Sequence, residues 1–380
     1  MLFYFLFYLT FLLFSLGQLG RFSLYNQQIN FYLYEIFLGL LLIILFFKYR
    51  LEPLKEVWKK YKTVFLFLII LFLSLVNGFY HYSLFQNFVG LLYLLRLIFY
   101  GGFVGYVGYE VKENPDFKKT LRNGILIITI MTIVTTITQY LLYPDLRNLF
   151  YQGWDPHLFR AFGVFFDTAI AGTIYGMIFL FTNQLIIKTI FLAFLVLSFS
   201  RSIYLSITIA LLYEFIKKIP RPRPAERDFA RNDRGGVKKI TIFFIFFLFL
   251  ILIAPKPAGE GVNLTRTFSI VSRLKDYQEG ANLFIKKPIL GYGYNRLRYV
   301  RNIQDSHAGA SFSSSYMTVL VSAGLIGLIS LIGLISQIWK HSKNARVLIV
   351  FLGTMSLFDN VLLHPFILFL AGVLFILFDR

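Results

Sequence analysis

The sequence predicts an all-α polytopic membrane protein, and its composition and its apolar runs are the observations that predict it. Of the 380 residues, 57% are hydrophobic and 15% are charged, and the mean hydropathy is +0.67. Apolar runs of membrane-crossing length recur from one end of the chain to the other. Because so few charged residues could not solvate a globule of 44.3 kDa, soluble folds are excluded.

About twelve apolar runs are expected to form transmembrane helices within a single transmembrane domain, residues 1–380. These runs cover residues 2–16, 29–47, 63–80, 84–109, 123–142, 167–182, 185–199, 203–216, 240–254, 312–338, 347–358 and 365–378. The pairs within 185–216 and 347–378 could each be one tilted helix instead. That arrangement would strand the charge of Arg201 or Asp359 near mid-membrane, which is costly, so two short helices are favoured in each case.

The distribution of Lys and Arg sets the expected orientation. With the N-terminus on the cytoplasmic side, the inner loops carry more basic residues than the outer loops, and the C-terminus is cytoplasmic as well. Residues 217–239 then form a basic cytoplasmic loop that contacts anionic membrane lipids, and residues 255–311 form one large outer loop. This orientation explains the net charge of +19, so no nucleic-acid partner is expected.

The outer loop 255–311 carries nine Lys and Arg residues, against the orientation rule. A phosphate-bearing ligand would explain them, and so would the tolerance of long loops for charge; both explanations stay open on this count. Residues 267–287 are predicted to form an amphipathic helix along the membrane surface, because apolar residues recur at steps of 4, 3, 4 and 3. Arg273 falls at the edge of the apolar face, where an ordinary snorkelling arginine would also lie.

The rest of this loop contains a turn and a histidine. Pro288 ends the amphipathic helix, and Gly291 and Gly293 allow a tight turn. His307 precedes the span 312–338, and a histidine at the membrane interface can act as a general base near neutral pH. A loop histidine without a task is the competing interpretation.

Two arginines fall within or beside the apolar spans. Arg201 follows a span of about fifteen residues, which is roughly 22 Å long against about 30 Å of hydrocarbon. Arg201 is therefore expected at or below the outer interface, where arginines facing protein or water mark functional sites. For Arg96 we expect a structural ion pair with Glu35 on the neighbouring span.

Four segments together resemble the O-antigen ligase and O-antigen polymerase family over about residues 160–378. They are Arg160 to Asp167 before the sixth span, Ser200-Arg201-Ser202 at a helix start, Arg273 fifteen residues before Pro288, and His307 followed by Gly324-Leu325-Ile326-Gly327. The first 150 residues match this family only in hydropathy. Asp167 and Ala308 replace frequent asparagines and Tyr277 replaces a common tryptophan, which puts the subtype in doubt more than the class.

The resemblance implies an inverting, metal-independent glycosyltransferase that needs no cofactor. Its donor would be a glycan on undecaprenyl diphosphate at the periplasmic face of a bacterial inner membrane. Arg201 and Arg273 would hold the diphosphate, and His307 would orient or deprotonate the acceptor hydroxyl. The expected further contacts to the diphosphate or the glycan are Arg160, Asp167, Arg266, Gly291 and Gly293.

Several alternatives remain at the level of sequence. A polymerase would extend a lipid-linked glycan, whereas a ligase would glycosylate a lipid A core sugar; the compact motif set and the single large loop favour the ligase. A polysaccharide flippase would be expected to show internal repeats and a central charged path, and neither is evident. A non-catalytic membrane scaffold is a further alternative. Transferases that hold a metal through acids in the first outer loop are disfavoured, because residues 17–28 contain no acid. Thiolate metal sites are excluded, because the chain has no cysteine.

Overall fold

The computed structural model describes residues 2–152, 155–218, 244–254, 262–264, 267–303 and 307–378, and this part of the chain is almost entirely helical. The helices are α1 (Leu2–Phe14), α2 (Leu33–Tyr49), α3 (Glu52–Lys60), α4 (Lys62–Asn77), α5 (Leu84–Glu113), α6 (Phe117–Leu142), α7 (Thr168–Phe181), α8 (Leu185–Leu197), α9 (Arg201–Lys218), Phe244–Ile253, α11 (Phe268–Lys286), α12 (Leu297–Val300), α13 (Ser315–His341), α14 (Arg346–Phe358) and α15 (Pro365–Phe378). Each of the twelve predicted runs overlaps one of these helices.

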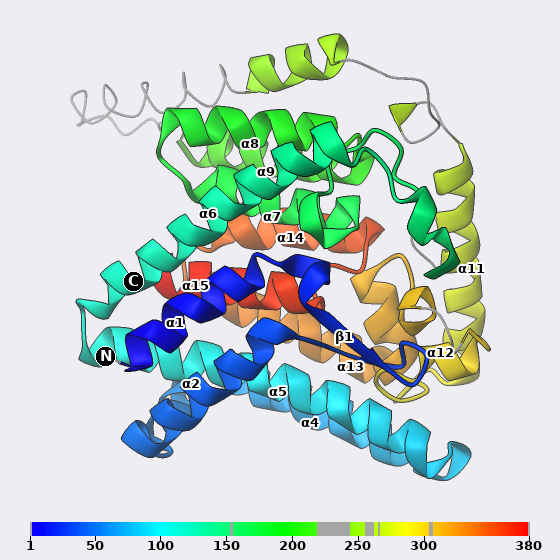
Figure 1. Ribbon diagram of the computed structural model, residues 1–380. Helices are drawn as coiled ribbons and strands as arrows, with labels where there is room; N and C mark the ends of the chain where they lie inside the picture. The colour runs from blue at the N-terminus through cyan, green and yellow to red at the C-terminus, as the bar shows by residue number, and fades with distance from the viewer. Residues whose placement is uncertain are drawn as a thin grey trace, which may run out of the picture.

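The long helices form a bundle whose two ends differ (Figure 1). Both termini lie at one end, whereas α11, α12 and the junction of α4 with α5 lie at the other. By length and composition, α5, α6 and α13 can each cross a membrane, and α3 with α4 would make a fourth span if their 97° bend is ignored. Six of the remaining helices are apolar but have fewer than 18 residues. The all-helical apolar fold is confirmed, while the count of twelve crossings and their orientation stay predictions.

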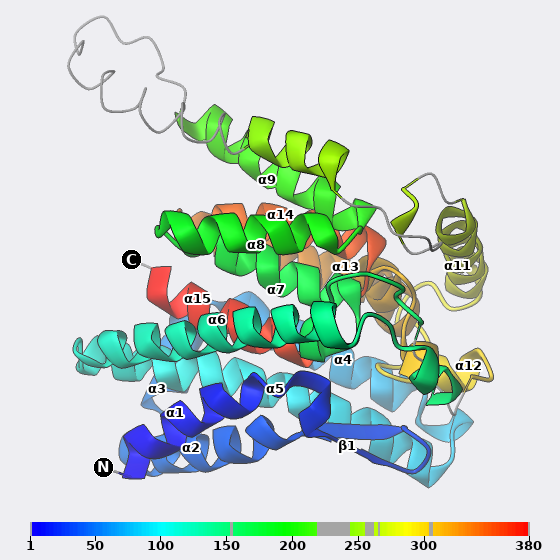
Figure 2. The same cartoon turned by 45° about the horizontal axis from the view of Figure 1, so that its top comes forward.

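Two expected segments are corrected by the structure. Residues 29–32 do not begin a helix; they form β2 (Ile29–Tyr32), which pairs antiparallel with β1 (Arg21–Leu24). The helix that follows starts later because Glu35 accepts a hydrogen bond from the Tyr32 backbone N–H at 2.9 Å and so caps α2. Figure 2 shows this hairpin running from α1 and α2 toward α12.

The second correction concerns residues 48–62, the connection between the predicted spans 29–47 and 63–80, which contains the helix α3. This helix begins with Glu52 and Pro53 in its first turn and ends with Lys59 and Lys60. Proline at the first turn, an acid at the N-terminus and bases at the C-terminus all favour a helix. Because α3 is short and polar on one side, its hydropathy resembles that of a loop.

The predicted ion pair between Arg96 and Glu35 is confirmed. Arg96 donates from Nε and from Nη2 to the two Glu35 carboxylate oxygens, each at 2.7 Å. Tyr100 donates its hydroxyl to the same carboxylate at 2.6 Å, and the Arg96 guanidinium also lies over the Tyr32 ring. The pair is largely buried and joins α2 to α5, so it fixes the start of α2 against its neighbour.

Glu35→Ala is expected to destabilise the protein by about 3–5 kcal/mol, because it leaves the Arg96 charge buried without its partner. Unfolding of the purified protein in detergent measures this change. Glu56→Ala breaks the exposed pair between Glu56 and Lys112 and is expected to leave unfolding unchanged. Equal stability losses in the two variants would contradict a structural role for the buried pair.

Helix α13 is broken at Gly324, which has φ +68° and a non-helical ψ. The turn that follows α11 fits into this break: the Tyr292 N–H donates to Val321 O at 3.1 Å, and the Leu325 N–H donates to Pro288 O at 2.8 Å. Gly291 has φ +65°, and a Cβ there would lie 2.4 Å from Val321 O. The predicted tight turn is therefore confirmed, and it anchors the segment after α11 to α13.

Candidate functional site

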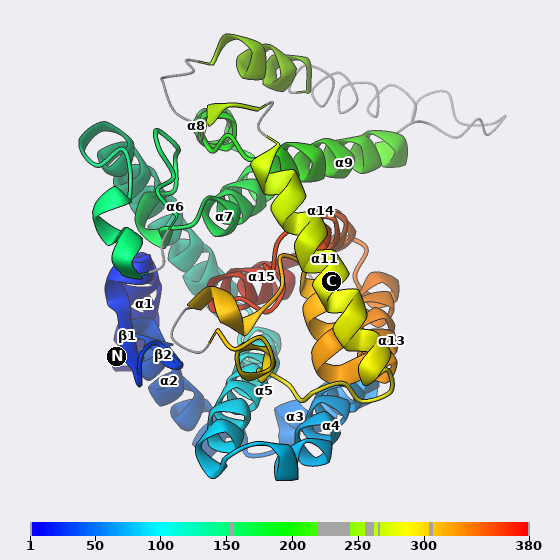
Figure 3. The same cartoon turned by 90° about the vertical axis from the view of Figure 1, so that its right-hand side faces the viewer.

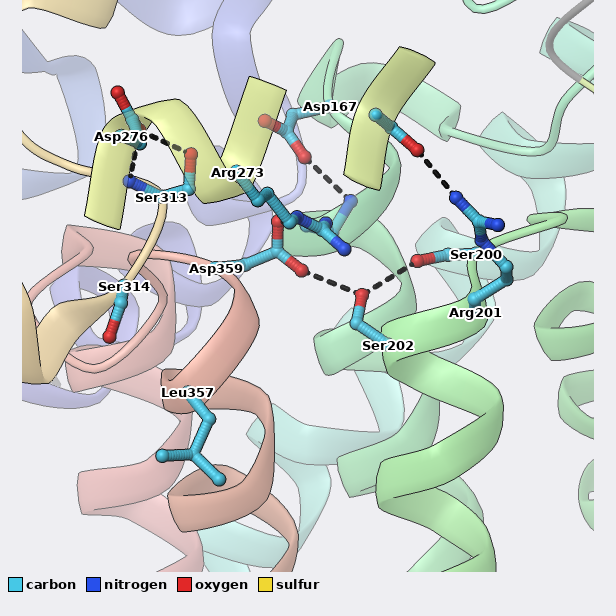
Figure 4. Close-up of polar contacts among 12 residues, drawn as sticks. Asp167, Ser200, Arg201, Ser202, Arg273, Asp276, Ser313, Ser314, Leu357 and Asp359 are labelled. Carbon is cyan, nitrogen blue, oxygen red and sulfur yellow. Dashed lines mark hydrogen bonds and ion pairs between the residues drawn. The ribbon is translucent and has the colours of Figure 1, made fainter. Parts of the chain in front are cut away.

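The site lies where two helix breaks meet α11. Arg201 is the first residue of α9, after the break that follows α8, and Asp359 directly follows α14. Arg273 lies in the second turn of α11, which runs across this end of the bundle (Figure 3). Figure 4 shows Arg201, Ser202, Asp359 and Arg273 side by side. The breaks predicted at Ser200 and at Asp359 thus place Arg201, Ser202 and Asp359 at this end of the bundle.

Asp359 is the centre of the polar contacts. Its Oδ1 accepts from Arg273 Nη2 at 2.9 Å, and its Oδ2 accepts from Ser202 Oγ at 2.6 Å (Figure 4). Ser202 Oγ is also 3.0 Å from Ser200 Oγ. Burial raises the pKa of Asp359 to about 6; the charge of Asp167 adds to the rise, while Arg273 opposes it. The fold therefore holds a carboxylate where ionisation is unfavourable, which is typical of functional sites.

The position of Asp359 is set by the N-terminus of α13. Ser315 Oγ donates to the backbone carbonyl of Asp359 at 3.3 Å and accepts from the Leu362 N–H at 3.1 Å. Ser314 Oγ donates to Ser356 O at 2.9 Å. These contacts hold both sides of the break between α14 and α15, so the Asp359 carboxylate has a fixed direction toward α11.

Arg201, at the start of α9, contacts α11 and the segment before it. Its Nη2 donates to Ser269 Oγ at 2.6 Å and its Nη1 donates to Leu264 O at 3.2 Å. Ser269 lies one turn before Arg273 on α11, so the two arginines meet the same helix at successive turns. Within the described residues, Arg201 makes no ion pair, so its charge is not balanced by a carboxylate there.

Two other predicted residues lie at the border of this cluster. Asp167 caps α7 by accepting from the Ala169 N–H at 2.6 Å and the Ile170 N–H at 3.1 Å. Figure 4 shows its carboxylate above Arg273 and Asp359. Arg160 is 8% exposed and donates from Nε to Ser198 O at 2.7 Å. This bond ties the segment before α7 to the end of α8.

The remaining predicted residues are placed differently or lie outside the described part. Gly291 and Gly293 pack against the break in α13, and a substrate contact through them stays a prediction. Arg266 lies outside the described residues. His307 begins a short 3-10 helix, His307–Ala310. The structure describes the backbone of this residue and not its side chain.

The segment that carries His307 is fastened to α11 by Arg301. Arg301 donates from Nε to Glu279 at 2.9 Å and from Nη2 to Asp276 at 2.8 Å. The same Asp276 carboxylate accepts from the Ser313 N–H at 2.8 Å. The backbone on both sides of His307 is thereby attached to the helix that carries Arg273.

Asp359→Asn is expected to remove a pH dependence of stability. Because the folded-state pKa of Asp359 is raised to about 6, the folded protein binds a proton more strongly than the unfolded chain does. The contribution of this carboxyl group to the free energy of unfolding should therefore fall by roughly 3 kcal/mol as the pH rises from about 4 to about 6. Above pH 6 this contribution should stay constant. Thermal unfolding of the wild type and of Asp359→Asn across this pH range measures the difference in stability between them. A difference that does not change with pH would contradict a raised pKa for Asp359.

Asp359, Ser202 and Ser269 were not predicted as site residues. Asp359 had been used only to place a break between two spans. An ionisable residue between two apolar spans is by itself a signal of function, and that signal could have identified Asp359. The two serines gave no comparable signal, because their contribution depends on contacts between distant segments.

The arrangement can bind a phosphate-bearing group. The guanidinium group of Arg201 on α9 lies at the turn of α11 before the one that carries Arg273. Guanidinium donors match phosphate oxygens in geometry and charge. The partly buried Asp359 holds Arg273 in place through an ion pair at 2.9 Å. No group of three or more His, Asp or Glu side chains suited to a metal ion occurs in the described part of the chain.

No curated protein matches the chain. A family model described as O-antigen ligase matches residues 186–332, a region that includes Arg201, Arg273 and His307 and ends before Asp359. The family comprises O-antigen ligases and polymerases of glycosyltransferase type. The matched region spans the helix break, α11 and the Pro-Gly turn on which the resemblance rested. Residues 186–332 of this chain are therefore similar to the O-antigen ligase family.

Proposed function

We propose that this protein transfers a glycan from undecaprenyl diphosphate to a hydroxyl of a lipid A core sugar, at the periplasmic face of a bacterial inner membrane. The observation that carries the proposal is the meeting of Arg201 and Arg273 on successive turns of α11 beside the partly buried Asp359. Two adjacent guanidinium groups suit a diphosphate, which presents negative charge over two neighbouring phosphoryl groups.

The reaction we propose is a single displacement. The acceptor oxygen forms a bond to the anomeric carbon while the bond between that carbon and the diphosphate oxygen breaks, and the bonding electrons leave with the diphosphate. Arg201 and Arg273 stabilise the negative charge that grows on the leaving group. His307 takes the proton of the acceptor hydroxyl. Because attack and departure occur on opposite faces, the anomeric configuration inverts.

Asp359 acts on Arg273 in this scheme. It holds the guanidinium at 2.9 Å and so orients Arg273 for the diphosphate. The α11 helix keeps both arginines at one level of the membrane, where a lipid-linked substrate presents its phosphates. Both substrates are lipid-anchored, so holding them at one interface adds an orientation contribution to the rate.

The positions of the chain ends support the proposed orientation. Both termini lie at the end of the bundle opposite α11 (Figure 1). If they are cytoplasmic, as the basic loops indicate, then Arg201, Arg273 and Asp359 face the periplasm. This is the side on which lipid A core and the lipid-linked glycan meet in the proposed reaction.

The acceptor decides between ligase and polymerase, and the matched family contains both. The test uses purified protein with a lipid-linked glycan donor, with or without lipid A core. A ligase yields glycosylated core only when core is present, whereas a polymerase yields longer lipid-linked chains from donor alone. His307→Ala should abolish either product while leaving donor binding intact. Movement of intact donor across vesicles without bond formation would contradict both activities and establish transport.

A further inference from the structure

A second arginine site lies at the same end of the bundle, between α4 and α5. A cleft of about 710 Å³ opens there, beside the junction of these two helices. Its walls are apolar and consist of Phe72, Leu75, Val76, Phe79, Leu84, Phe85, Phe88 and Leu91. Among the described residues that line it, Asn87 and Arg296 carry polar side chains. This cleft takes no part in the site described above.

Arg296 is buried with unsatisfied hydrogen-bond donors. The side chain is 1% exposed, and its Nη2 donates to Asn87 Oδ1. Its Nε and Nη1 have no hydrogen-bond partner among the described residues. The Tyr82 ring lies 4.7 Å from the guanidinium carbon, and no carboxylate of the described part pairs with it. A buried charge without an opposite charge is unfavourable and calls for an anion.

Asn87 cannot supply that balance, because its amide is neutral, and its hydrogen-bonding groups are already used. Its Nδ2 donates to Phe79 O at 2.9 Å and to Tyr82 O at 3.1 Å, and its Oδ1 accepts from Arg296. The side chain therefore orients the arginine and closes the junction of α4 with α5. The spare hydrogen-bonding capacity at the floor of the cleft belongs to Arg296.

The surrounding backbone is shaped for this guanidinium. A Cβ at Gly78 would lie 2.3 Å from Arg296 Nη1, and a Cβ at Gly293 would lie 2.7 Å from it. Gly293 has φ +106°, which L side chains rarely adopt. The second glycine of the Pro-Gly turn thus serves to bring Arg296 into the groove between α4 and α5.

We propose that this cleft binds the phosphate group of a membrane lipid, with Arg296 as the cationic contact and the lipid chains along α4 and α5. Several wall residues face outward from the bundle: Phe72 is 48% exposed, Val76 51% and Leu84 79%. Apolar walls of this kind suit acyl or isoprenoid chains, whereas the arginine suits the phosphate. A free phosphate ion would leave the apolar walls unused.

The lipid site is separate from the proposed diphosphate site. Helix α13 packs against α4 and also against α14, which ends just before Asp359. The two arginine sites therefore bind phosphate independently, and the lipid site does not depend on the transferase proposal. An experiment on it needs only a binding measurement.

The test counts bound lipid by native mass spectrometry on the full chain in detergent. The Arg201→Ala/Arg273→Ala variant serves as the parent, so that the proposed diphosphate site cannot contribute. The probes are dioctanoyl phosphatidate, dioctanoylglycerol and inorganic phosphate. Phosphatidate is expected to bind and the other two are not; adding Arg296→Gln should weaken phosphatidate binding about 10-fold or more.

Matched variants separate binding from folding. Arg298→Gln changes an equally buried arginine, 1% exposed, that does not line the cleft, and should leave binding unchanged. Val76→Trp fills the cleft without touching the charge and should weaken binding, whereas Leu95→Trp, at a 50% exposed position outside the cleft, should not. Phosphatidate binding that survives both Arg296→Gln and Val76→Trp, or equal binding of dioctanoylglycerol, would overturn the proposal.

Discussion

Arg201→Ala is expected to slow glycan transfer by about 10²–10³-fold, the range observed when one preorganised donor to a developing negative charge is removed. The effect should be large because Arg201 makes no ion pair within the described residues and its contacts are to Ser269 Oγ and Leu264 O. Its charge is therefore available to a ligand. Single-turnover rates with saturating lipid-linked donor measure the effect.

Conservative variants refine this expectation. Arg201→Lys keeps the charge but loses the paired donors, so part of the rate should return. Ser269→Ala removes the hydroxyl that orients Arg201 and should cost less than the loss of the arginine itself. Lys275→Ala removes an exposed positive charge from the same helix and should leave the rate unchanged. Equal losses in Arg201→Ala and Lys275→Ala would show that only general positive charge matters.

Arg273→Ala is expected to slow transfer by a similar factor, about 10²–10³-fold. It removes a second guanidinium from the leaving group and leaves the Asp359 carboxylate without its cation, 2.9 Å away in the wild type. The same rate assay, with donor affinity measured separately, divides the effect between binding and the chemical step.

A double-mutant cycle tests whether Arg273 and Asp359 act as a unit. If Asp359 works by holding Arg273, Asp359→Asn should slow the wild type but have little further effect in the Arg273→Ala background. The two substitutions would then be strongly non-additive. Fully additive losses would mean that Asp359 acts on the substrate or on another residue, and would contradict its assignment as a positioning residue.

Much of the fold could be predicted because it depends on local periodicity. The apolar steps in residues 267–287 predicted α11 to within one residue at each end. The charges at Arg201 and Asp359 marked the two helix breaks, because neither charge is stable in hydrocarbon. The pair of Arg96 with Glu35 was predictable for the same reason, since each charge needs the other within the apolar region.

The missed features depend on tertiary contacts. Arg273 and Asp359 are 86 residues apart in sequence, and nothing local in either segment indicates that they meet. The break in α13 at Gly324 is stable because the backbone of the Pro-Gly turn supplies hydrogen bonds to it, and a bare glycine in an apolar run does not show that. The hairpin Arg21–Tyr32 was missed because its second strand runs without a break into the apolar run of the helix that follows.

The most direct test of the transferase proposal is the stoichiometry of the two products in a single turnover. Purified protein is mixed with lipid-linked glycan and acceptor, and free undecaprenyl diphosphate and glycosylated acceptor are quantified together. We expect the two to appear in equal amounts, with an inverted anomeric configuration, and both to be lost in Arg201→Ala and Arg273→Ala. Release of diphosphate without glycosylated acceptor, or transfer that persists in both arginine variants, would contradict the proposed site.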